Sequence, residues 1–143
     1  MEIGIRLETS AVVPLLVAEP GSQACRRFWD DADAVVSCRL LYVEAAAALA
    51  QAQRMARLDG RRYVQARQLL DRLWAEIEVI ELDEVLAVAA ADAAHALGLC
   101  GDDAVHCAAA EQLADEDLVA ASGDRRLLAA WSERGLSTYD TNS

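Results

Sequence analysis

The chain has 143 residues, of which 55% are hydrophobic and 5% aromatic, and its 24 acidic and 13 basic residues give a formal net charge of −11. A chain of this length can bury a substantial core without disulfides or metal ions, so we expect one domain spanning residues 1–143. The acidic balance excludes a protein that grips nucleic acid or an anionic membrane through a basic surface alone. Chemistry on phosphates therefore needs another source of positive charge.

The basic residues are all arginine, and the sequence contains no lysine. A P-loop and a Schiff-base enzyme both need a lysine, so these mechanisms are excluded. The four cysteines have no CxxC spacing and no segment resembles a signal peptide. The apolar stretches 9–18 and 45–50 are far shorter than the ~20 residues of a membrane helix. We therefore expect a cytoplasmic protein with reduced thiols and no membrane partner.

The predicted elements alternate between strands and helices along the chain. We predict strands at 3–7, 34–38, 77–82, 118–121 and 137–139, and helices at 11–18, 22–31, 39–58, 61–75, 83–97, 101–114 and 124–134. The break at Asp59-Gly60 makes the region of about 39–75 a helical hairpin. Strands separated by helices pair in parallel through right-handed crossovers. The sequence therefore predicts a three-layer α/β/α sandwich around a mostly parallel sheet of four to five strands.

Three acidic residues fall at strand-to-helix junctions or helix starts, where such a fold places its ligands. Glu8 ends the first strand, Asp103 begins a helix, and Asp124 follows the 118–121 strand. An alternative interpretation is that these three are ordinary helix caps or first-turn acids. Glu44 lies one turn into an apolar helix and needs a partner. Together, four acids without a lysine or histidine among them suit an oxygen cage for Mg²⁺ or Mn²⁺.

Several segments resemble VapC-type PIN domains in the same order along nearly the whole chain. They are residues 8–12 (Glu-Thr-Ser-Ala-Val), residues 15–22, Glu44, residues 103–110 and residues 122–128. The resemblance implies a PIN-like fold and a metal-dependent endoribonuclease toxin that cleaves RNA with metal-activated water, leaving a 5′-phosphate and a 3′-hydroxyl. It also implies a cognate antitoxin whose basic C-terminal segment covers the active site. The surplus of Leu, Val and Ala on short helices favours a homodimer, alongside a toxin–antitoxin hetero-oligomer.

The resemblance assigns roles to particular residues. Its catalytic and metal-binding quartet corresponds to Glu8, Glu44, Asp103 and Asp124, and its small hydroxyl positions correspond to Ser10 and Ser122. We expect Asp103 and Glu8 to hold the principal ion, with Glu44 and Asp124 orienting waters or a second ion. Arg125, beside this cage, suits bidentate contact with a substrate phosphate, and the alternative is a surface pairing with nearby acids.

Glu8 is the one clear departure, because the family has aspartate at this position. The extra methylene moves the carboxylate roughly 1.5 Å further into the cage, and octahedral Mg²⁺ tolerates such shifts poorly. One alternative function is therefore a PIN-like module that binds an antitoxin with weak or lost catalysis. A metal-dependent phosphohydrolase acting on a small substrate is less favoured, because the sequence has no Gly-rich phosphate cradle.

Two further groups of residues have a distinctive charge or chemistry. Residues 51–72 carry six arginines and two aspartates, which gives a local charge of +4. One interpretation is that this charge guides RNA or contacts an acidic part of a partner, and the alternative is a solvated helix face. His95, Cys100, His106 and Cys107 lie close in sequence, but their spacing matches no common structural zinc pattern. We expect RNA affinity to depend on a divalent cation, whereas a basic antitoxin segment binds without one.

Overall fold

The structure, a computed structural model, describes residues 4–7, 9–113 and 118–142, with side chains described from residue 11 onwards. Its strands form one parallel sheet in the order β3-β2-β1-β4-β5. They are β1 (Gly4–Leu7), β2 (Ala34–Cys38), β3 (Ile77–Ile80), β4 (Leu118–Ser122) and β5 (Ser137–Asp140). The predicted parallel sheet is confirmed.

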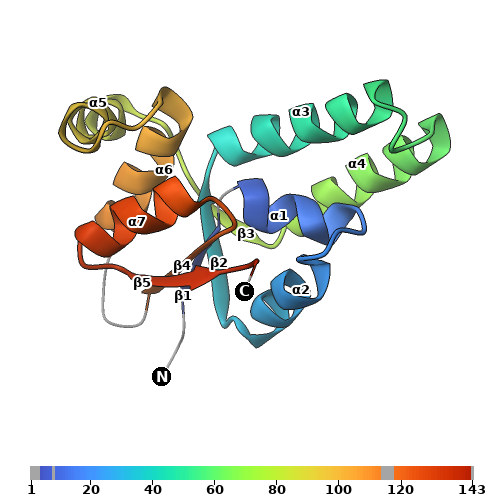
Figure 1. Cartoon of the computed structure of the whole chain (residues 1–143), viewed down its shortest axis with the longest axis horizontal. Coiled ribbons are helices and arrows are strands. Elements are labelled where there is room, and N and C mark those ends of the chain that lie inside the picture. The colour runs from blue at the N-terminus through green and yellow to red at the C-terminus, as the bar shows by residue number, and fades with distance from the viewer. Residues whose placement is uncertain (1–3, 8, 114–117, 143) are drawn as a thin grey trace.

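The helices connect these strands and cover the sheet (Figure 1). They are α1 (Thr9–Leu16), α2 (Ser22–Asp31), α3 (Leu40–Arg54), α4 (Gly60–Trp74), α5 (Glu84–Leu97), α6 (Gly101–Gln112) and α7 (Arg125–Glu133). Asp59 and Asp83 cap α4 and α5 by accepting a backbone N–H with the side chain. Gly98 ends α5 at a φ of 66°, in the left-handed region that glycine adopts without strain.

Helix α3 is shorter than the prediction of 39–58, since it ends at Arg54. Ala56 has a φ of 60°, which turns the backbone out of the helix. The N–H groups of Arg57 and Leu58 then both donate to the carbonyl of Ala52. A left-handed alanine carries a steric cost that sequence patterns do not anticipate, and here the turn is closed by these local backbone hydrogen bonds.

The core is divided between the two faces of the sheet. Leu118 and Ala120 of β4 pack in a cluster with α6 and α7, whereas Ala121 packs with α1, α3 and α4. On β2, Val35 belongs to the α1–α3–α4 side and Cys38 packs with α5 and α6. Because successive strand residues face opposite sides, these contacts define helices on both faces and confirm the three-layer sandwich.

Helices α3 and α4 form the predicted hairpin, which extends to one side of the sheet in Figure 1. Tyr42 on α3 donates its hydroxyl hydrogen to Asp71 on α4 at 2.6 Å and accepts from Arg67 at 3.0 Å. Arg67 also lies over the Tyr42 ring, 5.7 Å from its centroid. The two helices are therefore joined by polar contacts as well as by their apolar faces.

The order of the strands reverses between β1 and β4. The chain builds the sheet outward from β1 through β2 to β3, and then returns to place β4 on the other side of β1. Ligand sites of open parallel sheets lie at such a switch point, beyond the carboxyl ends of the strands. Leu7, Cys38 and Ser122 end the three strands that meet there.

No single described helix is long and apolar enough to cross a membrane, although α5 and α6 together, bent by 112°, pass the length and composition test as a pair.

Candidate active site

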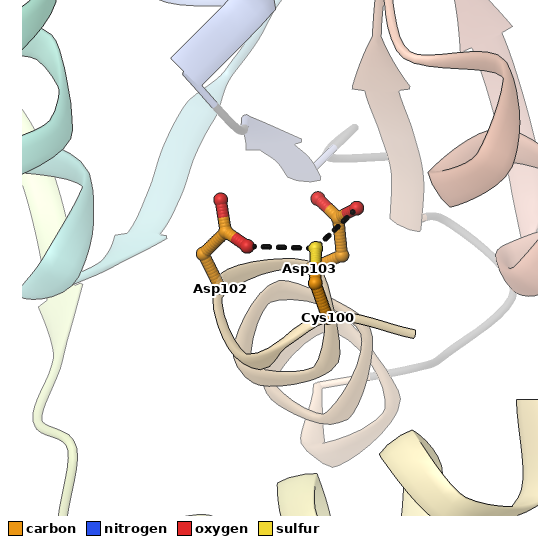
Figure 2. A group of neighbouring side chains, drawn as sticks. All are labelled: Cys100, Asp102 and Asp103. Carbon is orange, nitrogen blue, oxygen red and sulfur yellow. Dashed lines mark hydrogen bonds between the residues drawn. The ribbon is translucent and has the colours of Figure 1, made fainter. Parts of the chain in front are cut away.

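The start of α6 brings a thiol and two carboxyl groups together (Figure 2). The Cys100 thiol donates to Asp102 Oδ1 at 2.9 Å and to Asp103 Oδ2 at 3.2 Å. Figure 2 shows both carboxyl groups on the same side of the helix with the sulfur between them. One potential ligand atom from each residue lies within 4.8 Å of the other two. This group is the described cluster with the geometry to hold a metal ion.

The environment shifts the pKa values of all three residues. Burial, above all, raises the pKa of Asp103, and the negative charges of Asp124 and Asp102 raise it further, while the bond from Cys100 opposes the shift. The same thiol is the main cause of the lowered pKa of Asp102. The pKa of Cys100 rises to about 11, chiefly through its bond to Asp102, so the thiol keeps its proton at neutral pH.

Asp124 lies at the N-terminus of α7, directly after β4. Its Oδ1 accepts the backbone N–H of Arg126 at 2.9 Å, so the alternative interpretation as a helix cap is correct. The carboxylate also belongs to the acidic group, because its charge acts on Asp103. Ser122, fully buried at the end of β4, accepts the N–H of Asp124 with its hydroxyl oxygen at 2.8 Å. The capping side chain is therefore also the predicted site residue.

Glu44 meets the site from α3. Its Oε1 lies 2.5 Å from Nε2 of His106, a buried histidine on α6. A hydrogen bond with Glu44 also makes a small contribution to the lowered pKa of Asp102. The structure thus brings Glu44, Asp103 and Asp124 to one edge of the sheet, with Asp102 beside them.

The roles of three further predicted site residues are not tested by this geometry. Glu8 lies outside the described residues, and so does the side chain of Ser10, which belongs to α1. The exposed side chain of Arg125 follows Asp124 on the first turn of α7. Their roles stay predictions.

The donor set fits a hard divalent cation. Carboxylate oxygens are the ligands that Mg²⁺ and Mn²⁺ prefer, and in the part of the chain that the structure describes no arginine forms an ion pair with Asp102, Asp103 or Asp124. The raised pKa of Asp103 indicates negative charge that the protein itself leaves uncompensated. A bound cation would remove that cost.

Sequence reasoning missed three residues of this site, namely Cys100, Asp102 and His106. Cys100 and His106 were considered only as zinc ligands, for which their spacing is unsuitable. The spacing does hold a signal, because Asp103 and His106 are three residues apart and therefore share one face of α6. The partner of Glu44 lies 62 residues away in sequence, beyond the reach of any local pattern.

Comparisons with known proteins identify the class. A family model described as "PIN domain" matches residues 5–130. The chain therefore belongs to the PIN domain family, as the resemblance implied, and its acidic edge lies within the matched region.

The relatives within that family are VapC proteins. Ribonucleases VapC45 and VapC49 from two strains of Mycobacterium tuberculosis are each 39% identical over 123 residues, covering 86% of this chain and 85% of theirs. Among solved structures, FitAcB from Neisseria gonorrhoeae has a TM-score of 0.72 at 18% identity, covering 96% of this chain and 97% of that one. A toxin–antitoxin complex from Klebsiella pneumoniae has a TM-score of 0.67 at 13% identity, covering 95% and 98%. The VapC-type resemblance is confirmed.

Proposed function

We propose that this chain is the endoribonuclease toxin of a toxin–antitoxin pair, and that it hydrolyses RNA phosphodiester bonds in the cytoplasm with bound Mg²⁺ or Mn²⁺. The observation that carries the proposal is the convergence of Glu44, Asp103 and Asp124 at the switch point of the sheet. The 39% identity to VapC ribonucleases supports RNA as the substrate.

The predicted quartet of Glu8, Glu44, Asp103 and Asp124 would hold the cation. When bound, a divalent cation supplies the positive charge that attracts the scissile phosphate and makes a water acidic enough to attack at neutral pH. Burial keeps the charge of Asp103 poorly screened by solvent, which strengthens its attraction for a cation. The bonds that Asp124 accepts from α7 fix its carboxyl group against the helix.

Substrate contacts come from the residues around this edge. Arg125 is exposed one residue after Asp124, so its guanidinium can contact a phosphate beside the scissile one. The Ser122 hydroxyl accepts a hydrogen bond from the backbone N–H of Asp124. This bond favours a role for Ser122 in positioning Asp124, in addition to its predicted contact with RNA. Ser10 keeps its predicted role as the second hydroxyl.

A groove between α1 and α4 supports the proposal that the chain binds an antitoxin. Leu16, Val17, Leu58, Ala66 and Leu69 line it, and the exposed Arg26, Arg57, Arg62 and Arg72 lie along its edges. We call this surface the α1–α4 groove; two of its hollows measure about 540 and 710 Å³. It suits an amphipathic helix with acidic side chains beside its apolar face. The predicted basic C-terminal segment of the antitoxin suits the acidic edge instead.

Apolar side chains on the outer surface support the predicted homodimer or hetero-oligomer. Val43 is 62% exposed and Met55 60% exposed on the hairpin, and Val85 is 70% exposed on α5. Single exposed apolar residues are common, but three of those in the described part of the chain, Val43, Met55 and Val64, belong to the hairpin region.

The decisive experiment is RNA cleavage by purified Asp103→Asn protein in Mg²⁺ and in Mn²⁺. We expect the rate to fall at least about 100-fold, because a metal ligand should matter more than the partners that orient it. Glu76→Gln is the matched control, since Glu76 is an exposed acid outside the site. Unchanged cleavage by Asp103→Asn would contradict the proposal.

A second candidate, the antitoxin-binding module with weak catalysis, is favoured by the glutamate at position 8. Replacing Glu8→Asp and measuring RNA cleavage and growth arrest separates the two functions. A small change in rate supports the active enzyme. A large gain supports the weakly active module.

A further inference from the structure

A chain of side chains at the edge of the sheet joins all three layers of the fold. Cys38 ends β2, His106 lies on α6 and Glu44 lies on α3. Nδ1 of His106 is 3.7 Å from the Cys38 sulfur, and Nε2 is 2.5 Å from Glu44 Oε1. The imidazole therefore connects the sheet to a helix on each face.

Burial makes this arrangement specific. Cys38 is fully buried and His106 is 1% exposed, while the Glu44 side chain is 20% exposed. A carboxylate with so little solvent needs a hydrogen-bond donor, and among the described residues the ion pair of Glu44 is with His106. The histidine thus determines where this carboxylate lies relative to Asp102 and Asp103.

The contacts on the two sides of the ring bear on its tautomer. A carboxylate oxygen only accepts, so the contact with Glu44 places a proton on Nε2, and in the neutral ring Nδ1 then accepts from the Cys38 thiol. Nε2–H then donates to Glu44 Oε1. A thiol donating to Nδ1 would favour this same tautomer, so Cys38 can act on Glu44 through the ring.

We propose that His106 is a positioning residue for Glu44, and that Cys38 fixes the ring tautomer in which it works. This inference rests on the proposed function, because it takes Glu44 as part of the cation site. Outer hydrogen bonds that orient metal ligands typically change metal affinity by about 10- to 100-fold. His106 carries that role here.

The first test measures Mn²⁺ binding to the full chain by electron paramagnetic resonance of the free ion. We expect His106→Leu to weaken binding by about 10- to 100-fold, and His106→Gln, which restores an N–H donor, to recover most of that loss. His95→Leu is the matched control, because His95 is the other histidine of the chain and lies exposed on α5. Equal affinity of His106→Leu and the unmodified protein would overturn the proposal.

A double-mutant cycle separates positioning from a general effect on folding. If His106 acts through Glu44, then His106→Leu combined with Glu44→Gln binds Mn²⁺ no more weakly than Glu44→Gln alone. Additive losses would overturn the proposal. Should His106→Leu fail to fold, Cys38→Ala is measured instead, with a weaker loss expected and recovery in Cys38→Ser.

The ring tautomer gives a readout that does not depend on catalysis. Two-bond ¹H–¹⁵N spectra of the unmodified protein should show a His106 ring protonated at Nε2 and bare at Nδ1, and a proton on Nδ1 would overturn the role of Cys38. If the unmodified protein fails to cleave RNA, the proposed function fails while the Mn²⁺ measurements still decide the positioning. If it cleaves RNA and the variants bind Mn²⁺ normally, only the positioning fails.

Discussion

The acidic edge and the α1–α4 groove carry opposite charges, and these charges differ in how far they are exposed to solvent. At the edge, Asp103 is buried and its carboxyl group has no arginine partner among the described residues. Along the groove, Arg62 and Arg72 are exposed beside apolar side chains. Unscreened charge in a restricted space attracts a small ion, whereas solvated charge beside an apolar strip attracts a complementary protein surface. The net charge of −11 does not reveal that acidic and basic residues gather in separate regions of the molecule.

Outside the acidic edge, the largest expected effect concerns the groove. Arg62→Glu combined with Arg72→Glu should weaken binding of the cognate antitoxin by about 10- to 100-fold, because like charges then meet across the rim. Calorimetric titration with the antitoxin measures the affinity. Cleavage of RNA by the free variant should be unchanged, since both arginines line a hollow that none of Glu44, Asp103 and Asp124 lines. Unchanged affinity would contradict the proposal that the antitoxin binds in the α1–α4 groove.

Two aspartates at helix starts should affect stability in opposite directions. Asp103→Asn should stabilise the metal-free protein by about 1 kcal/mol, because it removes a buried charge that neighbouring carboxylates oppose. Asp124→Ala should destabilise it by about 1 kcal/mol, because α7 loses its cap. Thermal unfolding without divalent ions measures both, with shifts of about 3 °C each. Shifts of the same sign would contradict the contrast between a strained acid and a capping one.

The gain from Asp103→Asn should depend on pH. The folded-state pKa of Asp103 is raised, so the folded protein binds this proton more tightly than the unfolded chain does. Stability therefore falls as the pH rises from the ordinary aspartate range through the raised pKa. The advantage of asparagine is complete above the raised pKa and disappears at lower pH.

The smallest effects distinguish two arginines of the hairpin. Arg67→Gln should lower the melting temperature by less than either aspartate substitution changes it, since Arg67 donates to Tyr42 and lies over its ring. Arg54→Gln should leave it unchanged, because Arg54 is exposed on the last turn of α3. Equal losses would mean that the exposed arginines of this hairpin also stabilise it.

Local sequence signals predicted most of the fold. Aspartates before apolar runs marked the starts of α4 and α5, and Gly98 marked the end of α5, because each of these signals satisfies backbone groups within its own turn. The end of α3 was predicted four residues too late, since a left-handed turn at an alanine has no residue signal of the kind that glycine provides.

The site was predicted in part, for a related reason. The positions of Asp103 and Asp124 follow from the rule that ligands gather at the carboxyl ends of parallel strands. The need of Glu44 for a partner was also visible in its apolar surroundings. The identity of that partner could not be predicted, because His106 lies on α6 and contacts Glu44 from the opposite face of the sheet. The contribution of Glu8 stays a prediction.

The late insertion of β4 beside β1 has a consequence for synthesis on the ribosome. Strand β1 forms one edge of a growing sheet until residues 118–122 emerge and pair with it. Asp103 and Asp124 both come from the last third of the chain. A nascent chain that stops before β4 has neither the paired strand nor Asp124, so cleavage of RNA should begin only when translation is nearly complete. For an enzyme whose substrate surrounds the ribosome that makes it, this strand order delays activity until the chain can meet its antitoxin.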